Sequence, residues 1–184
     1  MLALSPFQLA DMTGESRGFS GKAPTVVCFI KEDCPTCREV MPVLAAMHDA
    51  LSQHLEFLVV GQTVDGNLQL QQEYAPPFAL LDDSALKVSF ATDIETVPTL
   101  VVTDSNGATV AEQVGFVRDD WQRVVNELAA QHQTDAISID WASLPEWRPG
   151  CGSLSVDPTH AERLLAEAEN SPIRARRIDV GSLD

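Results

Sequence analysis

The sequence predicts an α/β sandwich with a mixed central sheet, followed by a C-terminal extension. Short apolar, β-branched runs alternate with segments of helical periodicity over most of the chain, which is typical of α/β domains. The turn sequence Asp104-Ser105-Asn106-Gly107 separates the last two of these runs and predicts an antiparallel hairpin. Clear periodicity is lost after Thr134. We therefore expect a domain over residues 1–134 and an arm over residues 135–184.

Strands and helices are expected to alternate along the domain. The run Thr25–Ile30 is apolar and β-branched, as in a buried parallel strand. The helix that starts at Cys34 has an apolar face as far as Leu51 and contains Pro42, which we expect to kink it. The other expected strands span residues 55–60, 78–81, 99–103 and 108–114. The other expected helices span residues 68–74, 84–90 and 118–131.

The arm combines an irregular segment with one further helix. Residues 138–157 contain Trp, Pro and Gly without a clear period. Asp157 and Pro158 are typical of an N-cap and a first helical turn, so we expect a helix from there to about Glu169. Residues 173–180 are a possible strand. The large apolar side chains of the arm need cover from water, so we expect the arm to pack on the domain.

The composition narrows the class of partner. The chain has 184 residues, of which 45% are hydrophobic, enough for a real core. Its 27 Asp and Glu against 12 Lys and Arg give a net charge of −15, which repels nucleic acid and anionic lipid. No apolar run approaches the ~20 residues of a transmembrane helix. Residues 1–14 lack the basic start of a signal peptide, so we expect a cytoplasmic protein, or an exported one if a leader has been removed.

Cys34 and Cys37 form a C-x-x-C pair at the expected start of a helix. Two thiols at this spacing lie close enough to form a disulfide or to share a metal ion. The helix N-terminus stabilises a thiolate, so we expect Cys34 to be the exposed, attacking thiol and Cys37 the buried, resolving one. No second C-x-x-C is present and no histidine has a ligand spacing with this pair. Redox chemistry is therefore favoured over a metal site or a structural disulfide.

Further motifs accompany this pair. In chain order they are a strand at Val26–Ile30, the motif Cys34-Pro35-Thr36-Cys37, Pro42, the loop Thr96-Val97-Pro98-Thr99 and a hairpin that begins at Leu100. With these motifs the chain resembles the thioredoxin superfamily over residues 5–132. Residues 78–91 are similar to the extra strand–helix stretch of its TlpA-like/redoxin branch. These motifs are specific to the fold but not to one substrate.

The resemblance implies a thioredoxin-like three-layer sandwich and thiol–disulfide oxidoreductase activity. Cys34 and Cys37 would be the catalytic pair, with no bound cofactor and no metal. The substrate would be a protein or small-molecule disulfide or thiol, and the reductant an external thiol. The residues implied to bind substrate are Pro35, Thr36, Val97 and Pro98. A cis Val97–Pro98 bond would turn the Val97 backbone toward the cysteines, where an incoming peptide can pair with it as a strand.

The residues before the first cysteine depart from the family pattern. Glu32 and Asp33 precede Cys34, whereas many members have an aromatic residue in the last of these positions. Two carboxylates beside a thiolate raise its pKa. We therefore expect Cys34 to be less acidic than in a strong oxidant, which favours a reductant. If both carboxylates point to solvent, this effect is lost.

The other two cysteines are further departures. Cys28 stands where thioredoxin carries a buried aspartate that helps to move the proton of the second cysteine. We expect it to be a small buried apolar residue, with a third active-site thiol as the alternative. Glu95 is a candidate substitute for the missing base. Cys151, between Gly150 and Gly152, is either an inert cysteine or a thiol that exchanges with Cys34 if the arm folds back.

Two other functions are alternatives to oxidoreductase activity. A peroxiredoxin-like peroxidase would have Thr or Ser at the position of Lys31, so this class is disfavoured. A non-enzymatic interaction module of a larger protein, holding metal through Cys34, Cys37 and Cys151, remains as the alternative.

Overall fold

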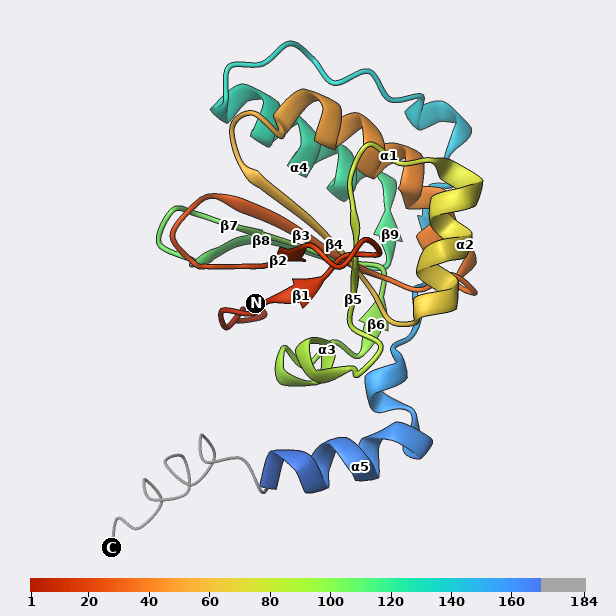
Figure 1. Cartoon of the computed structure of the whole chain (residues 1–184). Helices are drawn as coiled ribbons and strands as arrows, with labels where there is room; N and C mark the ends of the chain where they lie inside the picture. The colour runs from red at the N-terminus through yellow and green to blue at the C-terminus, as the bar shows by residue number, and fades with distance from the viewer. Residues whose placement is uncertain (170–184) are drawn as a thin grey trace, which may run out of the picture.

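A mixed sheet of five strands forms the centre of the computed structural model, which describes residues 1–169 (Figure 1). Its strands are β5 (Leu80–Asp82), β4 (Glu56–Gly61), β3 (Thr25–Ile30), β7 (Thr99–Thr103) and β8 (Thr109–Val114), in this order across the sheet. The first three run parallel, whereas β7 is antiparallel to both β3 and β8. The mixed sheet and its terminal hairpin are as predicted.

Helices cover both faces of this sheet. They are α1 (Pro35–Leu51), α2 (Val64–Tyr74), α3 (Lys87–Ala91) and α4 (Arg118–Gln131). In Figure 1, α1 and α4 lie together on the upper face and α3 lies on the lower side. α2 packs against β4 and β5. The result is the three-layer sandwich that the resemblance implies.

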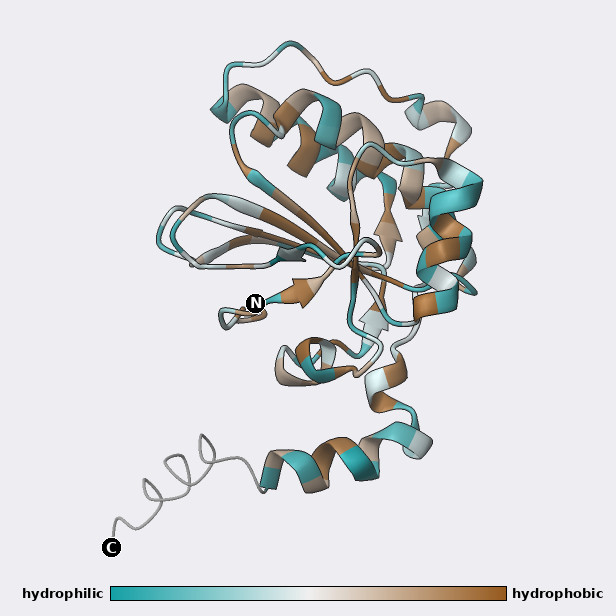
Figure 2. Cartoon of the chain, viewed as in Figure 1, coloured by the Kyte–Doolittle hydropathy of each residue, from teal (hydrophilic) through white to brown (hydrophobic). Residues whose placement is uncertain are grey.

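The core lies between the sheet and the pair of helices α1 and α4. All six residues of β3 are buried, because this strand is central and has neighbours on both edges and both faces. The hydropathy colours of Figure 2 show the strands converging in an apolar centre. From α4, Trp121 is fully buried, and its indole N–H donates to the carbonyl oxygen of Gly115 over 3.0 Å. The core therefore fixes the C-terminal end of β3, from which the loop to α1 begins.

Two helices differ from the predicted bounds. α2 begins four residues before the expected Leu68, because the hydroxyl of Thr63 accepts a hydrogen bond from the backbone N–H of Gly66 and caps the helix. The apolar pattern hides this first turn, since Val64 is exposed. α3 begins at Lys87 rather than Ser84, and the buried carboxylate of Asp83 binds the N–H groups of its first turn.

Several short strands were not predicted. Near the N-terminus, β1 (Leu9–Ala10) pairs with β2 (Ser16–Arg17). β6 (Thr96–Val97) lies just before β7, and β9 (Phe116–Val117) lies just before α4. Each of these strands has only two residues, too few for an alternating pattern to be recognised.

The arm packs on the domain, as predicted. It contains η1 (Trp141–Ser143), β10 (Trp147–Arg148), β11 (Cys151–Gly152), η2 (Leu154–Val156) and α5 (Pro158–Glu169). In Figure 1 the chain passes over α1 and α4 and then descends beside the sheet to α5, below α3. β10 pairs with β9, and β11 pairs with β6, both antiparallel. The possible strand at 173–180 lies outside the described residues.

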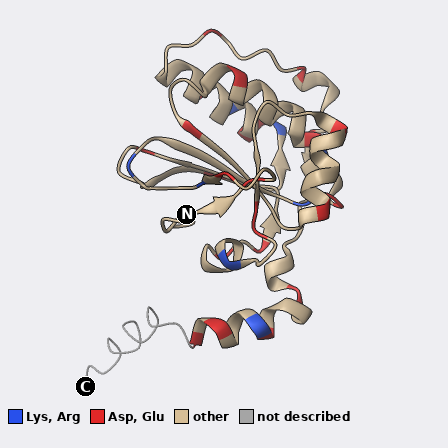
Figure 3. Ribbon diagram, in the orientation of Figure 1, with Lys and Arg blue, Asp and Glu red and all other residues tan. Residues whose placement is uncertain are grey.

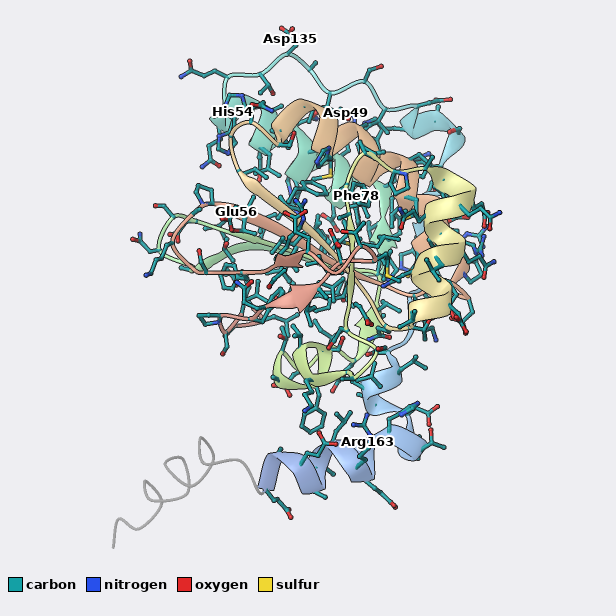
Figure 4. All side chains as sticks on the ribbon, viewed as in Figure 1. Asp49, His54, Glu56, Phe78, Asp135 and Arg163 are labelled. Carbon is teal, nitrogen blue, oxygen red and sulfur yellow. The ribbon has the colours of Figure 1, made fainter. Side chains whose placement is uncertain are left out.

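α5 begins at the predicted residue, and polar contacts hold it to the domain. Asp157 accepts a hydrogen bond from the backbone N–H of Thr159 over 2.8 Å, as expected of an N-cap. Arg163, labelled in Figure 4, donates to the carbonyl oxygen of Ala85 over 3.3 Å, and Glu167 pairs with Lys87 of α3 over 3.5 Å. These groups are exposed, so each contact stabilises the docked helix only weakly.

Acidic residues are distributed over most elements rather than gathered in one patch (Figure 3). Among residues 1–169, no helix is both long enough and apolar enough to cross a membrane.

Candidate functional site

The site begins where the buried strand β3 ends and α1 starts. Cys34 is the N-cap of α1, with extended backbone (φ −91°, ψ 112°), and Pro35 follows in the first turn. The sulfur of Cys34 accepts a hydrogen bond from the backbone N–H of Cys37 over 3.4 Å. It therefore occupies the place that a serine or aspartate oxygen takes at other helix starts, where unpaired N–H groups favour a negative charge.

The two thiols of the motif have opposite acidities. The pKa of Cys34 is lowered to about 5, first by a hydrogen bond from the thiol of Cys37 and further by hydrogen bonds from the side chain and backbone of Cys151, which together outweigh its burial. Burial raises the pKa of Cys37 well above its ordinary value, and the neighbouring Cys34 raises it further. At neutral pH the pair is one thiolate and one thiol. Of the two thiols, Cys34 is thus the one with the acidity that a nucleophile needs.

This acidity contradicts the expectation drawn from Glu32 and Asp33. Asp33 is 66% exposed at its side chain and pairs with Lys31 over 3.2 Å. The carboxylate of Glu32 accepts a hydrogen bond from the hydroxyl of Thr63 over 3.1 Å. Both carboxylates have other partners, so hydrogen bonds from the thiols and backbone determine the acidity of Cys34 instead.

The expected exposure of Cys34 is also wrong. Both Cys34 and Cys37 have 0% relative exposure. As a thiol, Cys34 donates to the carbonyl oxygen of Val97 over 3.4 Å. The Val97–Pro98 bond is cis, as the resemblance implies. Cys34 is covered because a strand of the arm, β11, pairs with the edge of β6, the strand that contains Val97.

Residues expected to bind substrate contact this arm. In β11, Cys151 is the partner of Val97 and Gly152 that of Thr96. The hydroxyl of Thr36 donates to the carbonyl oxygen of Pro149 over 2.6 Å. The structure thus brings Thr36, Val97 and Cys151 together with Cys34, whereas Pro35 stays exposed.

The two other candidate modulators do not join this group. Cys28 is fully buried within β3, and burial raises its pKa far above the ordinary value, so it stays a neutral core thiol. Glu95 is exposed, and its backbone carbonyl oxygen accepts from the N–H of Ser153. It is therefore not placed as a buried base beside Cys37.

Sequence reasoning missed two residues that hold the arm. In the sequence, Lys31 argues only against a peroxidase, yet its ammonium group donates to the carbonyl oxygen of Gly152 over 3.1 Å. Arg148 pairs with Glu39 of α1 over 3.1 Å. The glycines beside Cys151 were the available signal, because they allow a close approach of backbones.

The structure gives no support to a metal centre at this site. All four cysteines are free thiols. Within residues 1–169, no group of three or more His, Cys, Asp or Glu side chains is arranged to hold a metal ion.

A pH titration of thiolate absorbance should show the first ionisation near pH 5, because the pKa of Cys34 is lowered to about 5 and its thiolate predominates above that pH. In Cys151→Ala the midpoint should move to higher pH, since the hydrogen bond from the Cys151 thiol is lost. Cys151→Ser keeps a donor at the same place and should titrate like the wild type. A first midpoint near the ordinary cysteine value of about 8.5 would contradict the assignment.

Comparison with known proteins agrees with this geometry. Residues 19–129 match the family model described as a thioredoxin-like domain, which ends before the arm. No curated protein matches the sequence. A secreted Mycobacterium tuberculosis disulfide oxidoreductase homologous to DsbE of E. coli is similar in structure (17% identity, 67% of this chain and 95% of that chain, TM-score 0.56). So are StoA of Bacillus subtilis (18%, 66% and 95%, TM-score 0.57) and M. tuberculosis DsbF (24%, 66% and 94%, TM-score 0.54). At these identities the likeness shows the fold.

Proposed function

Since the chain belongs to the thioredoxin-like domain family, we propose that it is a thiol–disulfide oxidoreductase whose redox pair is Cys34 and Cys37. The observation that carries the proposal is the acidic Cys34 at the N-terminus of α1, hydrogen-bonded to a neutral Cys37 one turn further along. The solved structures similar to this chain include two described as disulfide oxidoreductases or members of the Dsb group, which supports the same chemistry.

The reaction consists of two exchanges of sulfur partners. The Cys34 thiolate attacks one sulfur of a substrate disulfide, forms a mixed disulfide and releases the other substrate sulfur as a thiolate. Cys37 then loses its proton and attacks the sulfur of Cys34, which releases the second substrate thiol and leaves a Cys34–Cys37 disulfide. The substrate gains two electrons and the pair loses two. An external thiol restores the dithiol, and no bound cofactor takes part.

The substrate we propose is a protein or peptide disulfide. The carbonyl oxygen of Val97 faces Cys34, and the edge of β6 accepts an antiparallel partner strand. Main-chain pairing of this kind binds extended peptides with little regard to their sequence. A peptide on β6 would present its sulfur to Cys34.

The acidity of Cys34 affects the reduction potential of the pair, and through it the direction of electron transfer. The expected reductant role rested on a raised pKa, and the pKa is lowered instead. A stabilised thiolate favours the dithiol form, so we expect a reduction potential less negative than the roughly −270 mV of thioredoxin. The reductant role then requires a thiol donor that keeps the pair reduced.

The proposal is tested by intact mass after thiol alkylation across a series of glutathione and dithiothreitol potentials. Cys34 should become unreactive in one two-electron step, and peptide mapping should find it linked to Cys37. Cys34→Ser should show no such step. If Cys34 and Cys37 stay alkylatable at every potential, the redox function is wrong.

A further inference from the structure

Residues 147–152 of the arm, here called the docking segment, lie where a peptide would bind. Cys151 and Gly152 pair antiparallel with Val97 and Thr96 of β6, so the edge that we propose for substrate is occupied by the chain itself. At its other end, Trp147 and Arg148 pair with β9. Two short strand pairings thus hold a single extended segment across the site.

Side-chain contacts from the cysteine motif also hold the docking segment. The hydroxyl of Thr36, inside the motif, donates to Pro149, and the ammonium group of Lys31 donates to Gly152. Gly150 lies so close to β6 that an added Cβ would be 2.3 Å from Cγ2 of Thr96. The docking segment thus contacts this surface at Pro149, Gly150 and Gly152.

A buried polar network anchors the chain just after the docking segment. The side chain of Gln62 donates to the hydroxyl of Ser153 over 2.6 Å and accepts from the backbone N–H of Leu154 over 3.0 Å. The hydroxyl of Ser155 donates to the carbonyl oxygen of Ile94 over 2.9 Å. These hydrogen bonds join the arm to the domain and form only while the arm is in place, so its return to the site is favoured.

The docking segment presents one sulfur to the redox pair. Cys151 is the strand partner of Val97, whose carbonyl oxygen lies 3.4 Å from the sulfur of Cys34, and both its side chain and its backbone contribute to the lowered pKa of Cys34. Cys151 is only half-buried, whereas Cys34 and Cys37 are fully buried. It therefore occupies the position that a cysteine of a bound peptide would take.

We propose that Cys151 is a third redox thiol, which the docking segment delivers to Cys34 as a tethered substrate on β6. The inference rests on the proposed function, because it uses the disulfide that Cys34 forms there. It adds a second internal disulfide, Cys34–Cys151, and an arm that excludes external substrates from β6 while it is docked. The match to the family model ends at residue 129, so this thiol lies outside the matched residues.

The step is a thiol–disulfide exchange that needs no added oxidant. Starting from the Cys34–Cys37 disulfide, Cys151 gives up its proton and attacks the sulfur of Cys34. The Cys34–Cys151 bond forms, the Cys34–Cys37 bond breaks, and Cys37 leaves as a thiolate that takes up a proton. The number of disulfides and the number of electrons are unchanged.

The charge on Cys34 controls when the thiol of Cys151 becomes reactive. In the dithiol form the pKa of Cys151 is raised to about 11, first by burial and then by the hydrogen bond and the negative charge of Cys34, against the opposing effect of Lys31. When Cys34 is in a disulfide, it carries no charge, so the pKa of Cys151 falls toward its ordinary value. The thiolate population of Cys151 therefore rises only after Cys34 is oxidised.

The experiment compares Cys37→Ser with Cys37→Ser/Cys151→Ser, using glutathione disulfide as the probe. In the double variant Cys34 should hold glutathione as a stable mixed disulfide. In the single variant Cys151 should displace the glutathione, so the adduct should be at least about tenfold less abundant and peptide mapping should find Cys34 linked to Cys151. If both variants carry equal adduct and Cys151 stays alkylatable, the inference is wrong.

Mapping of the wild-type chain separates the two proposals and does not depend on the folding of any variant. At intermediate glutathione potentials, peptides linked through Cys34–Cys37 and through Cys34–Cys151 should both be present. If only Cys34–Cys37 is found, Cys151 has no redox role and the proposed function stands. If Cys34 is linked to neither cysteine, the proposed function fails as well.

Discussion

Replacing Cys34 by serine is expected to slow the reduction of a protein disulfide such as insulin at least about a thousandfold, because the attacking group itself is removed. Cys34 carries the only cysteine thiolate expected at neutral pH among residues 1–169, since the pKa values of Cys28, Cys37 and Cys151 are all raised. A serine hydroxyl at the N-cap keeps the hydrogen bond that begins α1, so the fold should persist. The measurement is the initial rate with dithiothreitol as electron donor, corrected for the rate without protein.

Cys28→Ala is the matched control for this loss. It also removes a buried thiol from the same part of the molecule, but from within β3, where the side chain takes part in core packing. Its rate should stay within about twofold of the wild type, with the cost confined to folding stability. Equal losses in the two variants would show that the assay reports unfolding rather than chemistry, and a fully active Cys34→Ser would contradict the proposed mechanism.

Replacing Gly150 by alanine is expected to expose Cys34. The added Cβ would lie 2.3 Å from Cγ2 of Thr96 and 2.6 Å from the carbonyl oxygen of Val97. The second contact is with backbone, which cannot move without disrupting the pairing of β6 with β11. The docking segment should therefore leave β6, and alkylation of Cys34 by iodoacetamide should be at least about tenfold faster, equivalent to about 1.4 kcal/mol of docking free energy. The measurement is the second-order rate at neutral pH, followed by intact mass.

Gly152→Ala provides the control from the same segment. A Cβ at position 152 meets no heavy atom within 4 Å, so this change should leave the alkylation rate within about twofold of the wild type. If Gly150→Ala reacts no faster than Gly152→Ala, the arm does not limit access to Cys34. Gly150→Ala should also raise the pKa of Cys34, because the hydrogen bonds from Cys151 leave with the segment.

The sequence was sufficient to predict the long helices and strands of the domain, because their hydrophobic patterns are strong and unambiguous. β3 and α4 have the predicted bounds, and α5 begins as predicted, because Asp157 and Pro158 are local signals of a helix start. The beginning of α2 could not be read from apolar periodicity, because its first turn depends on a cap from Thr63 and exposes Val64. The two-residue strands depend on contacts between distant segments, which no local pattern records.

The candidate site was predictable in its parts but not in its electrostatics. The motif gave Cys34 and Cys37, and the loop at Val97 and Pro98 followed from the resemblance. The predicted direction of the Cys34 pKa shift is wrong, because the carboxylates adjacent in sequence are not the groups that act on the thiol. Asp33 is turned to Lys31 and solvent, whereas the pKa is lowered first by the thiol of Cys37 and further by Cys151, which is more than a hundred residues away in the chain.

The buried network of Gln62, Ser153 and Ser155 sets a minimum affinity for β6 that a peptide must have in order to reach Cys34. Because this network and the β9–β10 pairing hold both ends of the docking segment, the segment leaves β6 as a short loop and stays beside it. A short tether corresponds to an effective concentration on the order of millimolar. A peptide present at micromolar concentration must then bind β6 roughly a thousandfold more tightly than the segment does, a difference of about 4 kcal/mol. Under the proposed function, the arm would select partners that make contacts beyond the strand itself and would leave weakly bound disulfides unreduced.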